Sequence, residues 1–168
     1  MRIENKKIIL NIAELLLHDY GINVAIKATR DNKHYLAYCY PDSYEQVIYY
    51  NLNVNFEDAL DIDYRTFPCV EKISEFTATI FHEIGHMIHA TDFENEYAIM
   101  EIEQNALKDM FNSFKKTHPD ITGVELDYMY DCLPLEAMAN ELANTFDIEM
   151  IKEFDNEIKS YINRLAYR

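Results

Sequence analysis

Basic residues are scarce in this sequence, and that scarcity excludes two kinds of partner. Only 15 of the 168 residues are Lys or Arg, whereas 30 are Asp or Glu, so the formal net charge at pH 7 is −15. An acidic surface repels nucleic acid and anionic membranes, because both carry negative charge. We therefore expect no nucleic-acid or membrane partner, and we expect a basic protein partner to be attracted.

Cysteine pairs and long apolar runs are also missing from the sequence. Cys39, Cys69 and Cys132 are widely spaced and form no C-x-x-C pair, which is typical of reduced thiols and not of a disulfide framework or a structural zinc site. Near the N-terminus, Glu14 and Asp19 interrupt the apolar stretch that a signal peptide would need. No other segment is apolar for the length of a membrane span. The sequence thus predicts a soluble, cytoplasmic protein.

The sequence contains no internal repeat, low-complexity tract or linker that would mark a second domain. Its length is enough for one substantial core, and 49% of its residues are hydrophobic. We therefore predict a single domain over residues 1–168.

Hydrophobic periodicity changes along the chain and predicts the α+β class. From Ile9 the apolar residues recur with helical spacing, and Gly21 is placed to end this first helix near Tyr20. Three runs rich in β-branched and aromatic residues follow and predict strands. The first two are close enough for an antiparallel hairpin, and the third should complete one small, mostly antiparallel sheet. These runs are residues 22–29, 34–40 and 46–53.

The second half of the chain has mainly helical patterns. Residues 55–67 predict a loop with one short helical turn, and a helix should follow that starts between Val70 and Ser74. The acidic stretch from Asn95 to Lys116 predicts a helix with a solvated face and one apolar stripe, which consists of Ile99, Ile102, Ala106, Met110 and Phe114. We further expect a turn over 117–123, a short helix or ordered loop over 124–133, a helix from Pro134 to about Phe154, and a short helix over 155–168.

The strongest chemical signal lies between Glu75 and Thr91, where His82, Glu83 and His86 form an H-E-x-x-H motif. Two histidines four apart on an α-helix project from one face and can bind one metal ion from successive turns. Neutral imidazoles suit Zn²⁺, although Mn²⁺ and Fe²⁺ accept the same ligands. A catalytic zinc usually has three protein ligands and one water, and Glu83 would then be the general base.

The rest of this helix is amphipathic, with an apolar face opposite the histidines. At about 100° per residue, its apolar residues fall on the face opposite the histidines. One side should therefore pack into a core while the other borders a site. The alternative interpretation is a buried amphipathic helix whose polar stripe carries two histidines by chance. The apolar residues are Ile73, Phe76, Ile80, Ile84 and Met87.

A third ligand is expected on the helix that begins at Pro134. Glu136 and Asn140 are four apart and share a face, and the small Ala139 would let this helix approach the first one closely. Glu136 would bind the metal, and Asn140 would accept a hydrogen bond from a ligand imidazole. The alternative for Glu136 is an acid that only stabilises a helix N-terminus. Further candidates with less support are Glu125, Asp127, Asp131 and Glu141, and His89 is expected near the site but not as a ligand.

The residues HEIGHMIH, followed downstream by PLEAMANELANTF, resemble the ImmA/IrrE-type metallopeptidase family within the gluzincins. The shared pattern is H-E-x-G-H and then E-x-x-A-N before an apolar helical stretch, which covers less than a third of the chain. The resemblance implies a compact zincin-like fold, with His82, His86 and Glu136 as zinc ligands and Glu83 as the catalytic base. It also implies cleavage of a repressor-like protein, often one that controls a phage, a mobile element or a stress response.

Two functions follow from these patterns. The first is a zinc-dependent endopeptidase that hydrolyses a protein substrate, with Tyr128, Tyr130 or His89 as candidates for the donor that stabilises the oxyanion. The strand over residues 47–53 is expected to be a sheet edge that pairs with the substrate. The second is a non-catalytic antirepressor or inhibitor that binds a transcription factor and keeps a structural or vestigial zinc. The sequence makes no prediction of the oligomeric state.

Overall fold

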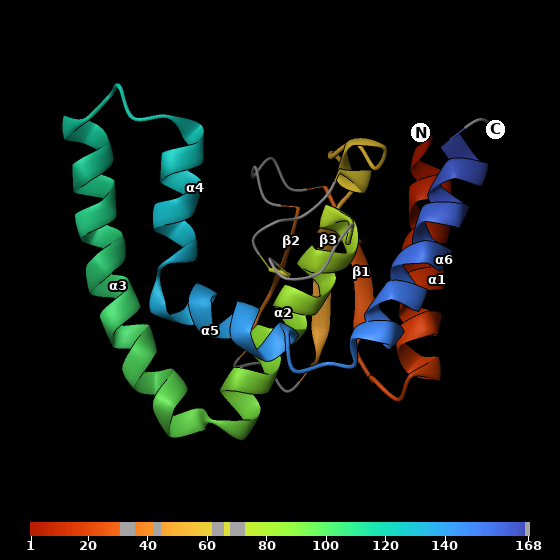
Figure 1. Cartoon of the computed structure of the whole chain (residues 1–168), viewed down its shortest axis with the longest axis horizontal. Helices are drawn as coiled ribbons and strands as arrows, with labels where there is room; N and C mark the ends of the chain where they lie inside the picture. The colour runs from red at the N-terminus through yellow and green to blue at the C-terminus, as the bar shows by residue number, and fades with distance from the viewer. Residues whose placement is uncertain (31–35, 42–44, 62–65, 68–72, 167–168) are drawn as a thin grey trace.

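A computed structural model of the chain describes residues 1–168 except for 31–35, 42–44, 62–65, 68–72 and 167–168, and except for the side chain of Asp127. Its described parts contain six α-helices, one short 3-10 helix and a three-stranded sheet, which confirms the α+β class. In Figure 1, α1 and α6 lie side by side on one flank of the sheet, α2 crosses beside it, and α3 and α4 stand on the other flank. None of the described helices is long and apolar enough to cross a membrane.

Helix α1 (Ile3–Asp19) ends where the sequence predicts. Tyr20 is its C-terminal cap, and Gly21 follows with a φ of 80°, a left-handed conformation that glycine adopts without a steric penalty. The face that carries Ile9, Ala13 and Leu17 is buried, and the helix packs against α6 (Ile148–Ala166) and the sheet.

The sheet contains β1 (Ala25–Thr29), β2 (Ala37–Cys39) and β3 (Val47–Asn51) in the order β1-β3-β2. β3 pairs in parallel with β1 and antiparallel with β2, so only one of the two pairings is antiparallel. The predicted hairpin between the first two strands is therefore wrong, because β3 lies between them. The expectation that residues 47–53 form a sheet edge is wrong for the same reason. β3 is buried at four of its five positions, which suits the central place.

Helix α2 (Glu75–Asp92) carries the H-E-x-x-H motif. Its N-terminal cap is Ser74, the last residue of the range in which the helix was predicted to start. The face opposite the histidines is buried in the core, from Ile73 to Met87. Asp155 of α6 fixes the start of the helix: its Oδ1 accepts hydrogen bonds from the Ser74 amide at 3.0 Å and from the Thr77 hydroxyl at 2.8 Å. The first turn of α2 is therefore tied to the C-terminal helix.

The short 3-10 helix η1 (Asp58–Leu60) is the single helical turn expected between the sheet and α2. The predicted helix from Pro134 to Phe154 is wrong, because the chain forms α5 (Pro134–Ala143) and then starts α6 (Ile148–Ala166). Asp147 accepts hydrogen bonds from the amides of Glu149 and Met150 and so begins a new helix. The short helix expected over 155–168 is, up to Ala166, the second half of α6, and residues 167–168 lie outside the described part of the chain.

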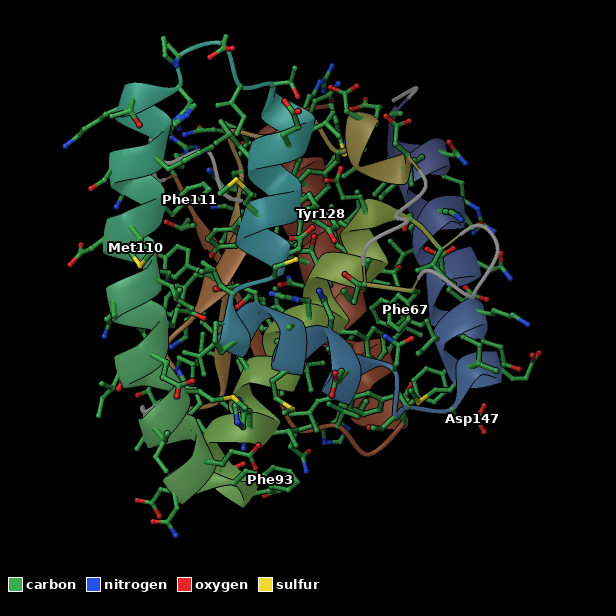
Figure 2. All side chains as sticks on the ribbon, turned by 60° about the vertical axis from the view of Figure 1, so that its left-hand side comes forward. Phe67, Phe93, Met110, Phe111, Tyr128 and Asp147 are labelled. Atoms are coloured by element: carbon green, nitrogen blue, oxygen red, sulfur yellow. The ribbon has the colours of Figure 1, made fainter. Side chains whose placement is uncertain are left out.

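Helices α3 (Glu94–Thr117) and α4 (Gly123–Asp131) form the flank farthest from α1 and α6. The apolar stripe of α3 does not face the core: Ile99 is 61% exposed, Ile102 is 72% exposed and Met110 is 67% exposed. Only Tyr97 and Gln104 of this helix are buried. Phe111, the neighbour of Met110, borders the space between α3 and α4 (Figure 2).

Candidate metal centre

Three side chains that the sequence singles out meet between α2 and α5. His82 and His86 project from successive turns of α2, and their Nε2 atoms lie 3.1 Å apart. Oε2 of Glu136, in the first turn of α5, lies 3.3 Å from Nε2 of His82 and 3.2 Å from Nε2 of His86. Fifty positions separate His86 from Glu136 in the chain, yet the fold places both at one point.

The triangle of these three atoms has the dimensions of a metal site. Tetrahedral ligands at about 2.0 to 2.1 Å from a Zn²⁺ ion lie roughly 3.3 Å from one another. The three measured separations, 3.1, 3.2 and 3.3 Å, are close to that value. Two imidazole nitrogens and one carboxylate oxygen are also the ligand types that divalent transition metals bind. The group His82, His86 and Glu136 could therefore hold a metal ion.

Asn140 orients one of the two imidazoles, as the sequence predicts. Its Oδ1 lies 2.7 Å from Nδ1 of His82. With the amide oxygen as acceptor, Nδ1 of His82 carries the proton, so the neutral ring presents the lone pair of Nε2 to the site. The spacing of four between Glu136 and Asn140 thus gives α5 both a candidate ligand and the residue that positions another candidate ligand.

Gln104 of α3 positions Glu136, and the sequence analysis did not identify it. Its Nε2 donates to Oε1 of Glu136 at 3.1 Å, which leaves Oε2 facing the histidines. Its Oε1 accepts from the Leu135 amide at 2.8 Å, one of the unpaired donors at the start of α5. The side chain is 3% exposed, so both contacts are shielded from water. The signal in the sequence was the heptad Tyr97, Gln104 and Phe111, on the face opposite the apolar stripe.

Gly85, inside the motif, allows α2 and α5 to come together. A Cβ added at Gly85 would lie 2.2 Å from the carbonyl oxygen of Ala139, far closer than such atoms can approach. Ala139 and Ala143 are fully buried in this contact region, which agrees with the close approach that their small size predicts. The backbone of α5 therefore lies almost directly on the ligand helix.

The electrostatics of the group favour positive charge at its centre. Burial alone would raise the pKa of Glu136, but hydrogen bonds and charge interactions with the two histidines outweigh it and hold this pKa well below its usual value. Burial alone would lower the pKa of His82, but hydrogen bonds to Glu136 and Asn140 and the charge of Glu83 raise it. Glu136 and the two histidines therefore stabilise opposite charges on one another despite the burial of the carboxylate.

Glu83 borders the cavity next to the three ligand side chains and is 8% exposed. Cys39 of β2 lies close to it, because the thiol is 3.6 Å from the Glu83 carbonyl oxygen. Burial raises the pKa of the Cys39 thiol, and the negative charge of Glu83 raises it further. Both effects favour the neutral thiol, and Cys39 is not part of the group formed by His82, His86 and Glu136.

A cavity of about 980 Å³ opens over the group. Its walls come from β2, α2, α3, α4 and α5, so the region inserted between the two motifs forms one side of it. Besides the candidate ligands, the residues that border the cavity include Tyr38, Glu83, Gln104 and Tyr130. Among the described strands, β2 is the one that borders the cavity, and it is an edge strand.

The remaining candidates differ in their position. Tyr130 and Asp131 border the cavity, although Asp131 is not part of the ligand group. Tyr128 is 71% exposed on α4 and does not border it (Figure 2). His89 is fully buried outside the cavity wall, with its ring 5.2 Å from that of Tyr97. Glu125 is exposed in a capping box at the start of α4, Glu141 is exposed on α5, and the side chains of Asp127 and Cys69 lie outside what the structure describes.

No protein-family model, no curated protein sequence and no solved structure matches this chain.

Proposed function

We propose that this protein is a zinc-dependent endopeptidase. The observation that carries the proposal is the placement of Glu83, a carboxylate that borders the same cavity as His82, His86 and Glu136 without being needed to complete that group. A purely structural metal site does not require a further acidic side chain beside its ligands. The three-ligand set also leaves a coordination position for water, which is the arrangement of catalytic zinc sites.

When bound, Zn²⁺ would lower the pKa of a water and polarise the oxygen of a substrate carbonyl. His82, His86 and Glu136 would hold the ion, and Asn140 and Gln104 fix the orientation of His82 and Glu136. Glu83 takes a proton from the attacking water and returns it to the nitrogen of the leaving amine. Tyr130 is the remaining candidate of the three for the oxyanion donor, because it borders the cavity.

We propose that β2 presents the substrate. It pairs with β3 on one side, and its residues Ala37, Tyr38 and Cys39 border the cavity. An extended peptide that adds to an edge strand gains main-chain hydrogen bonds and passes the ligand group in a defined direction. This assignment replaces the expected role of β3, which lies in the centre of the sheet.

The substrate proposed from the motif resemblance is a repressor-like protein in the cytoplasm. The support for it is the pair of motifs H-E-x-G-H and E-x-x-A-N, which resemble the ImmA/IrrE-type peptidases. The long spacing between them is accommodated by α3 and α4, which leave both motifs in contact.

Hydrolysis of a randomised peptide library by the zinc-loaded protein tests the proposal. We expect Glu83→Gln to lower kcat by about 10²- to 10⁴-fold, the usual contribution of a general base, while zinc content and melting temperature stay unchanged. Glu101→Gln is the matched control, because Glu101 borders the same cavity from α3 and lies outside the ligand group. Equal hydrolysis by wild type and Glu83→Gln, or no hydrolysis by either, would reject the peptidase. Retained biological activity in Glu83→Gln would favour the non-catalytic binding protein.

A further inference from the structure

Helix α3 turns a charged face toward the cavity. The residues of α3 that border the cavity lie on one side of the helix, opposite Ile99 and Ile102. From Gln104 to the end of the helix, the charged residues on this cavity side are Lys108 and Lys115. Because they are seven residues apart, they stand almost directly above one another on the helix surface.

Both lysines lack an acidic partner among the described residues. Lys27, Lys152 and Lys159 each form an ion pair with a neighbouring carboxylate, whereas no such pair includes Lys108 or Lys115. The ammonium of Lys108 lies 6.0 Å from the centre of the Tyr130 ring, which keeps it on the cavity side between α3 and α4. Two cations on one wall with no acidic partner in the described part of the chain are unusual in a protein with a net charge of −15.

The other charges that border the cavity lie elsewhere. Glu83 and Glu136 belong to the ligand region, and a bound divalent cation offsets their charge. Glu75 comes from α2, Glu101 from the part of α3 before Gln104, and Asp131 from the end of α4. The part of the cavity wall that α3 forms after Gln104 is therefore positively charged. The described acidic residues of the cavity lie on other elements or precede Gln104 on α3.

The rise of the helix gives the positions of the two lysines along α3 relative to the ligand group. Gln104 touches Glu136 and so marks the level of the ligand group on α3. At 1.5 Å per residue, Lys108 lies about 6 Å and Lys115 about 16 Å farther along the axis. For an extended peptide that runs along α3, at about 3.3 Å per residue, these distances correspond to about two and about five substrate residues.

We propose that Lys108 and Lys115 form a subsite for acidic residues of the substrate, located about two to five residues from the bond that is cut. The inference rests on the proposed function in that the bound segment belongs to the substrate. The net negative charge of the protein opposes an acidic ligand at long range, but at physiological ionic strength this field is screened beyond about 8 Å. The contact with the two lysines acts within that distance.

Binding of immobilised dodecapeptides, with Asp, Asn or Lys placed at one position at a time, tests the subsite at 0.15 M salt. The protein used is zinc-loaded Glu83→Gln, so that the result does not depend on cleavage. We expect Asp to bind up to about fivefold better than Asn, the upper range for a partly exposed ion pair. Lys108→Glu and Lys115→Glu should each remove or reverse this preference.

The matched control is Lys116→Glu, which changes the same charge on the next residue of α3, outside the cavity wall. It should keep the preference for Asp. The subsite is rejected if no peptide binds, if Asp has no advantage over Asn, or if Lys116→Glu weakens that advantage as much as Lys115→Glu.

A cleavage profile of the same peptides with the active protein separates this inference from the proposed function. Acid-selective binding without hydrolysis would reject the peptidase and keep the subsite. Hydrolysis with no preference for Asp or Glu in the two to five residues beside the cut bond would reject the subsite and keep the peptidase.

Discussion

Helices α2 and α3 are consecutive in the chain and both are amphipathic, yet they direct their apolar faces oppositely. α2 buries ten of its 18 residues, whereas α3 buries two of its 24. The apolar face of α2 packs into the core, but that of α3 faces outward while its polar face borders the cavity. The apolar pattern therefore identifies the buried face of α2 but the exposed face of α3. Such a pattern marks the buried face of a helix only when apolar contacts hold that helix against the core. Buried Gln104 and Tyr97 mark the inner face of α3.

The largest expected effect concerns the contact of α2 with α5. Gly85→Ala places a Cβ against the Ala139 backbone, so the two helices must separate. We expect a loss of about 3 kcal/mol or more in the free energy of unfolding, together with loss of metal binding. Chemical denaturation and metal analysis measure both.

Gly123→Ala is the control for that change. A Cβ at Gly123, the first residue of α4, meets no atom within 4 Å, so this variant should keep wild-type stability and metal content. Equal stability of Gly85→Ala and wild type would contradict the close approach of the two helices.

A second pair of variants tests whether the apolar face of α2 is buried and that of α3 exposed. Ile80→Ala empties a fully buried site on α2 and should cost about 2 to 5 kcal/mol of stability. Ile102→Ala removes the same atoms from an exposed site on α3 and should change stability by no more than about 0.5 kcal/mol. Thermal or urea unfolding measures both, and a large loss in Ile102→Ala would show that α3 packs with its apolar stripe inward.

The last pair of variants concerns the polar face of α3, where the expected effect is on metal binding. Gln104→Leu removes the donor that fixes Glu136 and should weaken metal binding by about 10- to 100-fold. Asn105→Leu is the matched control, because Asn105 also borders the cavity but is exposed. Competition with a metal-binding dye measures the affinities. Equal affinities in the two variants would mean that Gln104 does not position the ligand.

Local signals were sufficient for much of the fold. Gly21 ends α1 and Pro134 starts α5 as the sequence indicates, because each acts on its own turn of the chain. The start of α2, after Ser74, falls at the end of the range predicted for it. The order of the strands was not predictable in this way, since the parallel pairing of β1 with β3 joins residues distant in sequence. The break before α6 was missed because Asp147 looked like one more acid in a helical pattern.

In the candidate metal centre, too, local spacings were predictable from the sequence and contacts between helices were not. His82, His86, Glu136 and Asn140 follow from spacings of four within single helices, and the structure brings all four together. Gln104 could not be assigned, because its role depends on how α3 packs against α5 and not on its neighbours in the chain.

Metal binding by purified protein tests the central claim most directly. Elemental analysis after incubation with Zn²⁺ and desalting should give about one zinc per chain in wild type, and none in His86→Ala or Glu136→Ala. Glu141→Ala is the control on α5, because Glu141 is exposed and turned away from the ligand face, and it should retain the metal. Circular dichroism should show that all variants are folded. A wild-type protein without zinc, or a folded Glu136→Ala that binds zinc as tightly as wild type, would contradict the metal centre.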